Sequence, residues 1–230
     1  MPHLFHHPLC PHSRFVRLAL AEYGLDVELI EERVHERRED FLLIDPAGRT
    51  PVLVADGGLV VSGAVVAAEW LEEAYGPSFP NVRLMPSDIA GRVETRRLLD
   101  WFHGKMFAEV TDWLVTEKIY RRFMTSAQGG GGPDMGAVRA ARANIRLHLS
   151  YIGFLVSDRN WLAGNRMTYA DLAAAAHLSC ADYLGDVPWD EFEPAKAWYQ
   201  KMKSRPSFRT LLADRVIGMA PSAVYADLDF

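Results

Sequence analysis

The chain contains 230 residues, of which 49% are hydrophobic and 24% are charged, proportions that are typical of a folded globular protein. Its formal net charge of −5 and its isoelectric point of about 5.9 argue against a nucleic-acid-binding protein, which normally presents a basic surface. Two cysteines, Cys10 and Cys180, are too few for a disulfide framework. No segment has the pattern of a signal peptide or a membrane span. We therefore expect a cytoplasmic protein without direct membrane insertion.

The first 75 residues alternate between short apolar runs and amphipathic segments. Residues 3–7 and 27–31 have the pattern of strands, and residues 13–24 between them have that of a helix ending at Gly24. A β-hairpin follows, in which "PVLVAD" and "LVV" flank an Asp-Gly-Gly turn. Residues 64–74 are predicted to form a second helix. The order β-α-β followed by β-β-α predicts an α/β domain with a mixed sheet.

The rest of the chain has helical periodicity. Residues 76–87 are rich in proline and lack periodicity, so they are interpreted as a linker between a domain at 1–75 and an all-helical domain at 88–214. Residues 215–230 are interpreted as a C-terminal tail. Helices are predicted at 88–107, 109–124, 134–157, 168–183, 191–202 and 206–214. The fourth of these opens with Thr168 and Asp171 in the spacing of a capping box.

Eight histidines raise the question of a metal site. His3, His6, His7 and His12 crowd the start of the chain, but they alternate with strand and turn residues. No second cluster of cysteines or histidines with zinc-ligand spacing follows later in the sequence. The sequence therefore predicts no metal site.

Four short stretches, in this order, resemble the glutathione S-transferase superfamily. They are "PLCPHSRFVRLAL", "PAGRTPVLV", "LVVSGAVV" around Ser62, and "AGNRMTYADL". The resemblance covers nearly the whole chain and implies a thioredoxin-like N-terminal domain followed by an all-helical C-terminal domain. It also implies that the Thr50-Pro51 peptide is cis, a form that X-Pro bonds adopt at modest cost. In this family, the turn presents the backbone of the residue at Thr50 to the cysteinyl part of glutathione.

The resemblance also defines a glutathione cleft made of Cys10, Thr50, Pro51, Val61 and Ser62. Cys10, just ahead of a helix whose dipole lowers the pKa of a thiol, and Ser13 are the candidate catalytic residues if the chain is an enzyme. The family usually places an acid before the serine, to pair with the ammonium of glutathione, whereas here Val61 precedes Ser62. Because a hydrogen-bonded charge pair contributes about 1.5–3 kcal/mol, we expect glutathione affinity to be reduced.

The tail is neither polar nor poor in aromatic residues, which distinguishes it from a disordered segment. Two interpretations remain open. The tail folds back over the protein's own surface, or it forms a docking element for a partner. The candidate partner-binding residues are Tyr225, Asp227, Leu228, Asp229 and Phe230.

With this tail, and with Val61 in place of the usual acid, the chain resembles a division-associated branch of the superfamily. Proteins of this branch bind the bacterial tubulin homologue FtsZ. This resemblance implies a non-enzymatic homodimer, without a cofactor, that acts at the division site. There it bundles and curves FtsZ filaments and helps to activate constriction and cell-wall synthesis through divisome components bound by the tail. The alternative is a transferase or thiol reductase that uses glutathione. A ligand-carrying or chaperone-like member of the fold is a third hypothesis. Arginines expected on the surface, as candidate contacts for an acidic partner, are Arg14, Arg37, Arg38, Arg121 and Arg122.

Overall fold

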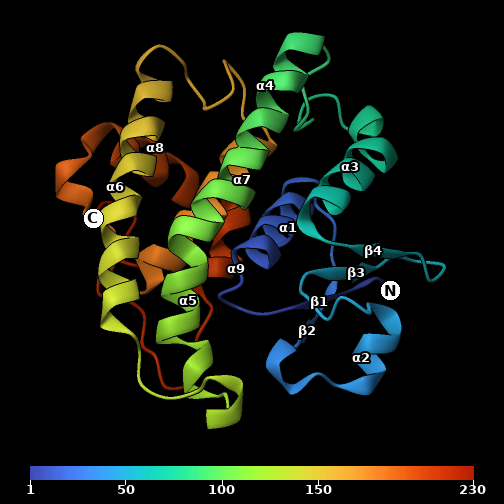
Figure 1. The fold of residues 1–230 in the computed structure, drawn as a ribbon. Coiled ribbons are helices and arrows are strands. Elements are labelled where there is room, and N and C mark those ends of the chain that lie inside the picture. The colour runs from blue at the N-terminus through green and yellow to red at the C-terminus, as the bar shows by residue number, and fades with distance from the viewer.

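A four-stranded mixed sheet forms the centre of the N-terminal domain in the computed structural model, which describes residues 1–230 (Figure 1). The strands lie in the order β2-β1-β3-β4, with β1 and β2 parallel and the other two pairs antiparallel. The four strands are β1 (His3–His6), β2 (Glu28–Glu31), β3 (Val52–Val54) and β4 (Val60–Ser62). The mixed sheet predicted from the sequence is thereby confirmed.

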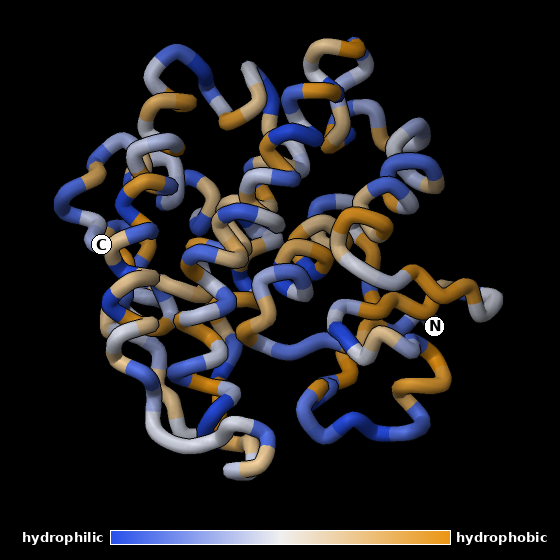
Figure 2. The backbone as a smooth tube through the Cα atoms, viewed as in Figure 1, coloured by the Kyte–Doolittle hydropathy of each residue, from blue (hydrophilic) through white to orange (hydrophobic).

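Alternating side chains of the strands serve two different faces of this sheet. Leu4, Leu53 and Val61 pack against helices α1 (Pro11–Glu22) and α3 (Ala64–Ala74) within the main core. Phe5 and Val52 point to the other face and contact Phe41 of the short helix α2 (Glu39–Ile44). Figure 2 shows the apolar residues along these strands. The bounds of α3 agree with the prediction, whereas α2 and the 3₁₀-helix η1 (Val34–Glu36) were not predicted.

Helices make up nearly all of the C-terminal domain, which follows a segment containing only the 3₁₀-helix η2 (Gly76–Ser78). The longer elements are α4 (Ile89–Asp100), η3 (Trp101–Thr111), α5 (Asp112–Lys118), α6 (Met135–Ser157), α7 (Tyr169–Tyr183), α8 (Glu193–Lys203) and α9 (Arg209–Leu212). Single 3₁₀ turns, η4 (Tyr120–Arg122), η5 (Ser126–Gln128), η6 (Trp189–Glu191) and η7 (Pro206–Phe208), connect them. None of the helices combines the length and the hydropathy that crossing a bilayer requires.

The elements α4, η3 and α5 form one continuous helical segment where two helices were predicted, at 88–107 and 109–124. The element η3 between α4 and α5 is a π-helix, so the chain continues through this region in wider turns instead of breaking. Runs of π-helix this long are unusual, because most occur as single-turn bulges near functional sites. The prediction of a break is therefore wrong, and η3 contributes side chains to the cleft described below.

Helix α7 occupies the middle of the molecule and is buried along its entire length. Its capping box is confirmed, since Thr168 accepts a hydrogen bond from Ala170 N while Asp171 accepts one from Thr168 N at 2.9 Å. α7 packs against α1 of the other domain, and one core of 44 buried residues runs through both domains. The two domains thus form one packed body.

Arg14 lies inside this body, not on the surface where the sequence pattern placed it. Its side chain is completely buried, and hydrogen-bond acceptors from the turn before α1, from α7 and from the tail surround the guanidinium. It donates to Pro8 O at 2.6 Å, to Ser179 Oγ at 2.8 Å and to Tyr225 OH at 3.0 Å. Arg14 therefore ties the first helix to α7 and to the tail.

Candidate functional site

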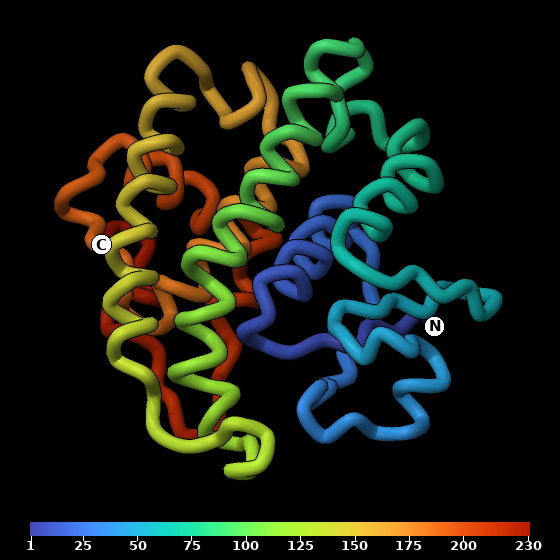
Figure 3. Tube along the Cα trace, viewed as in Figure 1, coloured from blue at the N-terminus to red at the C-terminus, as the bar shows by residue number.

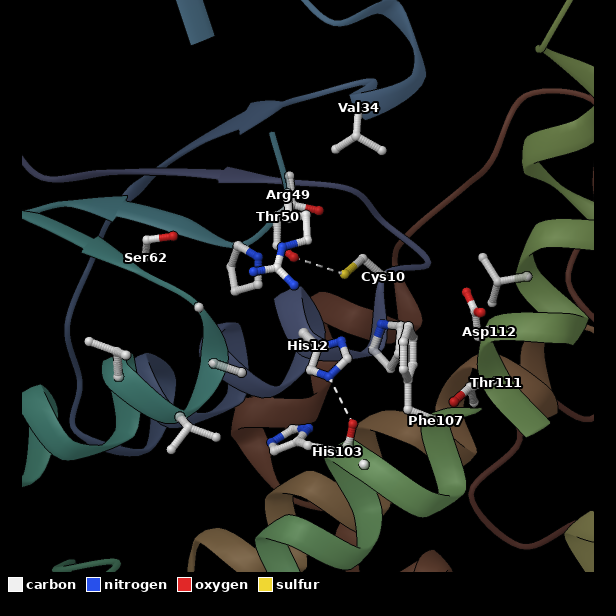
Figure 4. A pocket seen from close by; sticks show the side chains of 18 of the residues that line it. Cys10, His12, Val34, Arg49, Thr50, Ser62, His103, Phe107, Thr111 and Asp112 are labelled. Carbon is white, nitrogen blue, oxygen red and sulfur yellow. Dashed lines mark hydrogen bonds between the residues drawn. The ribbon is translucent and has the colours of Figure 1, made fainter. Parts of the chain in front are cut away.

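A cleft of about 680 Å³ opens between the two domains. Its N-terminal wall consists of the turn ahead of α1, the loop before β3 and the start of α3, and its other wall is formed by η3 and α5. Figure 4 shows side chains from both walls pointing into this space. Cys10, Thr50, Pro51 and Ser62, four of the residues predicted from the sequence, line the cleft together.

Cys10 is the N-cap residue of α1. Its Sγ accepts a hydrogen bond from Ser13 N and donates one to Thr50 O at 3.6 Å. Burial acts to raise the pKa of the Cys10 thiol, but the hydrogen bond and charge of His12, together with the Ser13 contacts, lower this pKa to about 7. By contrast, burial raises the pKa of the Cys180 thiol to about 12. Cys10 is therefore the thiol of this chain that is equipped for chemistry.

This contrast predicts selective alkylation. Iodoacetamide is expected to modify Cys10 in the native protein with an inflection near pH 7, while Cys180 remains unmodified until the protein unfolds. Mass spectrometry of peptides after timed labelling measures both rates. A Cys180→Ala variant is the control and should leave the labelling rate unchanged. Equal labelling of both cysteines, or an inflection near pH 9, would contradict the assignment.

The backbone of the cleft has the features that the family resemblance implied. The Thr50–Pro51 peptide is cis, which confirms that prediction. Pro51 O accepts a hydrogen bond from Gly63 N, so this loop is held against the start of α3. Gly63 has a φ of +90°, and no side chain caps the helix that follows it. The N-terminus of α3 therefore borders the cleft and has no capping side chain.

Two predicted site residues lie outside the cleft lining. Ser13 is completely buried, and its Oγ accepts a hydrogen bond from His7 N at 3.4 Å. Val61 is 4% exposed and packs into the core opposite Leu53, because successive residues of β4 point to opposite faces and Ser62 takes the cleft side. The isopropyl group of Val61 therefore does not face the cleft, although the sequence motif had implied that it does. Ser62 Oγ donates a hydrogen bond to Asp45 Oδ1 at 3.1 Å.

Several cleft residues were missed by sequence reasoning. The N-terminal domain adds Arg49 and His12, and the helical domain contributes the acids Asp100 and Asp112 and the aromatic rings of Phe107 and Tyr120. The four-residue spacing of His103, Phe107 and Thr111 was the available signal, because it places these side chains on one face of a helix. The cleft thus offers charges of both signs and an aromatic wall.

The tail is folded onto the protein at two points. Tyr225 is completely buried, and its hydroxyl donates to Leu211 O at 2.8 Å. The ring of Phe230 packs 5.2 Å from that of Trp189, and its O accepts a hydrogen bond from Gln200 Nε2 at 3.0 Å. The final segment, red in Figure 3, runs back along the helical domain between these contacts. Tyr225 and Phe230 therefore face inwards.

Three of the four residues between the two anchors are candidate partner-binding residues, and all three face solvent. Asp227 and Asp229 are exposed, and Leu228 is 41% exposed. Asp229 N donates to Asp227 Oδ1 at 2.9 Å, which holds this segment in a turn. Of the five candidate partner-binding residues, Asp227, Leu228 and Asp229 are thus accessible. We call these three residues the tail loop.

Comparisons with known proteins agree with this fold and cleft. Residues 4–79 match the model of the glutathione S-transferase N-terminal domain, and residues 136–206 match that of the glutathione S-transferase C-terminal domain. The chain belongs to the glutathione S-transferase family.

Individual relatives extend the similarity over the whole chain. FtsZ-localized protein A of Caulobacter vibrioides is 46% identical over 230 residues, which covers 99% of this chain and 97% of that protein. The solved structure of FzlA from C. crescentus has a TM-score of 0.92 and covers all of this chain and 99% of its own. A crystal structure described as a glutathione S-transferase from Sinorhizobium meliloti 1021 is 51% identical, with a TM-score of 0.97 and complete coverage of both chains.

Proposed function

We propose that this protein is a non-enzymatic partner of FtsZ that acts as a homodimer at the division site. The observation that carries the proposal is the similarity to FtsZ-localized protein A, which extends over 99% of the chain and therefore includes the tail. In this proposal the dimer bundles and curves FtsZ filaments, because a two-fold dimer presents two copies of one binding surface. The tail loop contacts other divisome components and helps to activate constriction and cell-wall synthesis.

Exposed apolar side chains on α3 and α4 support the homodimer. Val65 and Val66 are 50% and 56% exposed on α3, where they also line the cleft, and Val93 is 61% exposed on α4. The two helices lie side by side, as the hydrogen bond that Arg96 of α4 donates to Glu69 of α3 at 2.9 Å shows. An apolar surface spread over two adjacent helices is typical of a protein–protein contact.

Val93→Glu tests the dimer. The variant is expected to weaken self-association by about 100-fold, because the new carboxylate would be buried in the interface without a partner. Sedimentation equilibrium measures the association, and electron microscopy of FtsZ filaments shows whether bundling is lost with it. Leu147→Glu, at a 52% exposed position on α6, is the matched control and should remain dimeric. A fully dimeric Val93→Glu protein would contradict the proposed interface.

Leu228→Asp tests the tail loop separately from filament binding. We expect this variant to sediment with FtsZ like the unmodified protein, since the domains are unchanged, but to slow constriction in dividing cells. Ile217→Asp alters another exposed apolar residue near the C-terminus, 72% accessible, and serves as the control. Normal constriction by cells carrying Leu228→Asp would refute the role of the tail loop.

The geometry of Cys10 favours a second candidate function, a glutathione-dependent transferase or thiol reductase. A thiol with a pKa of about 7 beside a cis-proline turn is suited to attack glutathione disulfide, which forms a mixed disulfide on Cys10 and releases one molecule of reduced glutathione. Calorimetric titration with glutathione and a thiol-transfer assay distinguish the two functions. The absence of both glutathione binding and thiol transfer, together with normal division in cells carrying Cys10→Ala, supports the binding function. Saturable binding with turnover supports the enzyme.

A further inference from the structure

Three histidines that are far apart in the sequence meet at the wall of the cleft. His12 comes from the first turn of α1, His103 from the π-helix η3 and His177 from the middle of α7. One ring nitrogen of each lies within 4.8 Å of those of the other two. The rings of His12 and His103 stack with their centroids 4.9 Å apart. Three separate elements thus bring their imidazoles together.

The hydrogen bonding of this group is incomplete. His103 Nδ1 and His177 Nε2 are 3.1 Å apart and share one hydrogen bond. The other nitrogen of His103, Nε2, has no hydrogen-bond partner, and it is buried, since the residue is only 9% exposed.

The protein encloses both inner histidines, since His177 is completely buried and His103 is 9% exposed. Neutral imidazole nitrogen is a common ligand of zinc, cobalt, nickel and copper ions. Phe15 packs edge-on against His103 at 4.7 Å and closes the inner side of the group.

We propose that His12, His103 and His177 form a binding site for one divalent transition-metal ion, such as Zn²⁺, at the wall of the cleft. The site goes beyond the division role proposed above and does not depend on it. It also revises the expectation from sequence spacing that the chain has no metal site.

The distances suit this use. Two nitrogens bound to the same tetrahedral ion at 2.0–2.1 Å lie about 3.3 Å apart, close to the present separation of His103 Nδ1 and His177 Nε2. The third ligand, His12, is half-buried and lines the cleft, where its Nε2 lies 3.4 Å from His103 O. With three protein ligands, the remaining position opens to the cleft, which is the arrangement of zinc sites that bind an exchangeable ligand.

A second layer of contacts orients His177. Thr111 Oγ1 lies 2.7 Å from His177 Nδ1, which fixes the ring and leaves Nε2 directed at His103. Hydrogen bonds of this kind to the second ring nitrogen are characteristic of metal-binding histidines. Thr111→Val is therefore expected to weaken metal binding by about 10–100-fold while keeping all three histidines.

The test uses the full chain without a histidine tag. The apo protein is titrated with Co²⁺ and with Zn²⁺ at pH 7.5, and bound metal is counted by mass spectrometry after gel filtration. The proposal predicts one ion per chain, visible absorption of tetrahedral Co²⁺ that Zn²⁺ abolishes, and a rise in melting temperature with added metal. Stoichiometry, spectrum and stabilisation are all measured without reference to FtsZ or to glutathione.

Variants identify the ligands. His12→Asn alters the half-buried ligand, so the protein should still fold, and it is expected to lose the Co²⁺ spectrum and at least about tenfold in affinity. His3→Gln, on β1, is the matched control and should keep both. The proposal is overturned if the unmodified protein binds no ion, or if His12→Asn and Thr111→Val both bind Co²⁺ with the same spectrum and affinity as the unmodified chain.

Discussion

Replacing Arg14 with methionine is expected to destabilise the protein by about 3–5 kcal/mol, the usual cost of removing one partner from a buried ionic network. Arg14 is completely buried and lies 3.4 Å from Asp214. Without its guanidinium, Pro8 O and Ser179 Oγ lose a charged donor inside the core. Urea denaturation followed by circular dichroism measures the change in the free energy of unfolding.

The same change is expected to loosen the tail first. Tyr225 keeps its hydrogen bond to Leu211 O but loses the donor on its other side, so the segment after Asp214 should exchange amide hydrogens faster than the helices. Arg139→Met, which alters an exposed arginine of α6, is the control and should stay within about 0.5 kcal/mol of the unmodified protein. Arg14→Met with unchanged stability and tail exchange would show that the buried network contributes nothing.

Mild acid is the second condition expected to have a large effect. Burial, reinforced by the charges of Arg17 and Arg14, lowers the pKa of His6 to about 3. Burial, followed by the charges of His6, Arg14, His35 and Arg33, also lowers the pKa of His7 to about 3. Both side chains are neutral in the folded protein at pH 7, where the native state has its full stability with respect to these groups.

The sign follows from the unfolded chain, in which a histidine has a pKa of about 6.5. Below that pH the unfolded state binds protons at these histidines and the folded state does not. The free energy of unfolding therefore falls as the pH drops from about 7 towards 3. Below pH 6.5 each group changes the free energy of unfolding by about 1.4 kcal/mol per pH unit, so the pair loses about 4 kcal/mol between pH 6.5 and pH 5.

Urea denaturation at pH 7, 6 and 5 measures this loss. His7→Asn removes one titrating group while its side-chain oxygen can still accept the hydrogen bond that Leu9 N donates to His7 Nδ1. The variant should therefore show a shallower pH dependence, and His3→Gln should not change it. A denaturation midpoint that stays constant from pH 7 to pH 5 would contradict the assigned pKa values.

Local pattern was sufficient for most of the fold. The helix over residues 64–74 was predicted with the bounds of α3, because an amphipathic run starts directly after a glycine. α2 escaped detection, because a six-residue helix is too short to show a period. The π-helix η3 was also missed, because the sequence was interpreted as two helices with a break at residue 108, whereas the wider turns of η3 continue the helix through this position.

The site was predictable only where one short motif contains the chemistry. Cys10 and the Thr50-Pro51 turn follow from local sequence, and both line the cleft. The meeting of His12 with His177 follows from the packing of α1 against α7, which no spacing encodes. Arg14 was assigned to the surface for the same reason, because its acceptors lie as far as 211 positions along the chain.

The two anchors of the tail have a consequence for recognition. Because Tyr225 and Phe230 hold both ends of the tail loop, its backbone has already lost most of its conformational freedom before any partner arrives. Binding of a partner to such a preordered turn costs less conformational entropy than binding to a flexible peptide that must first become ordered. Three side chains on a fixed frame can thereby serve as an epitope that would be too small on a free chain end.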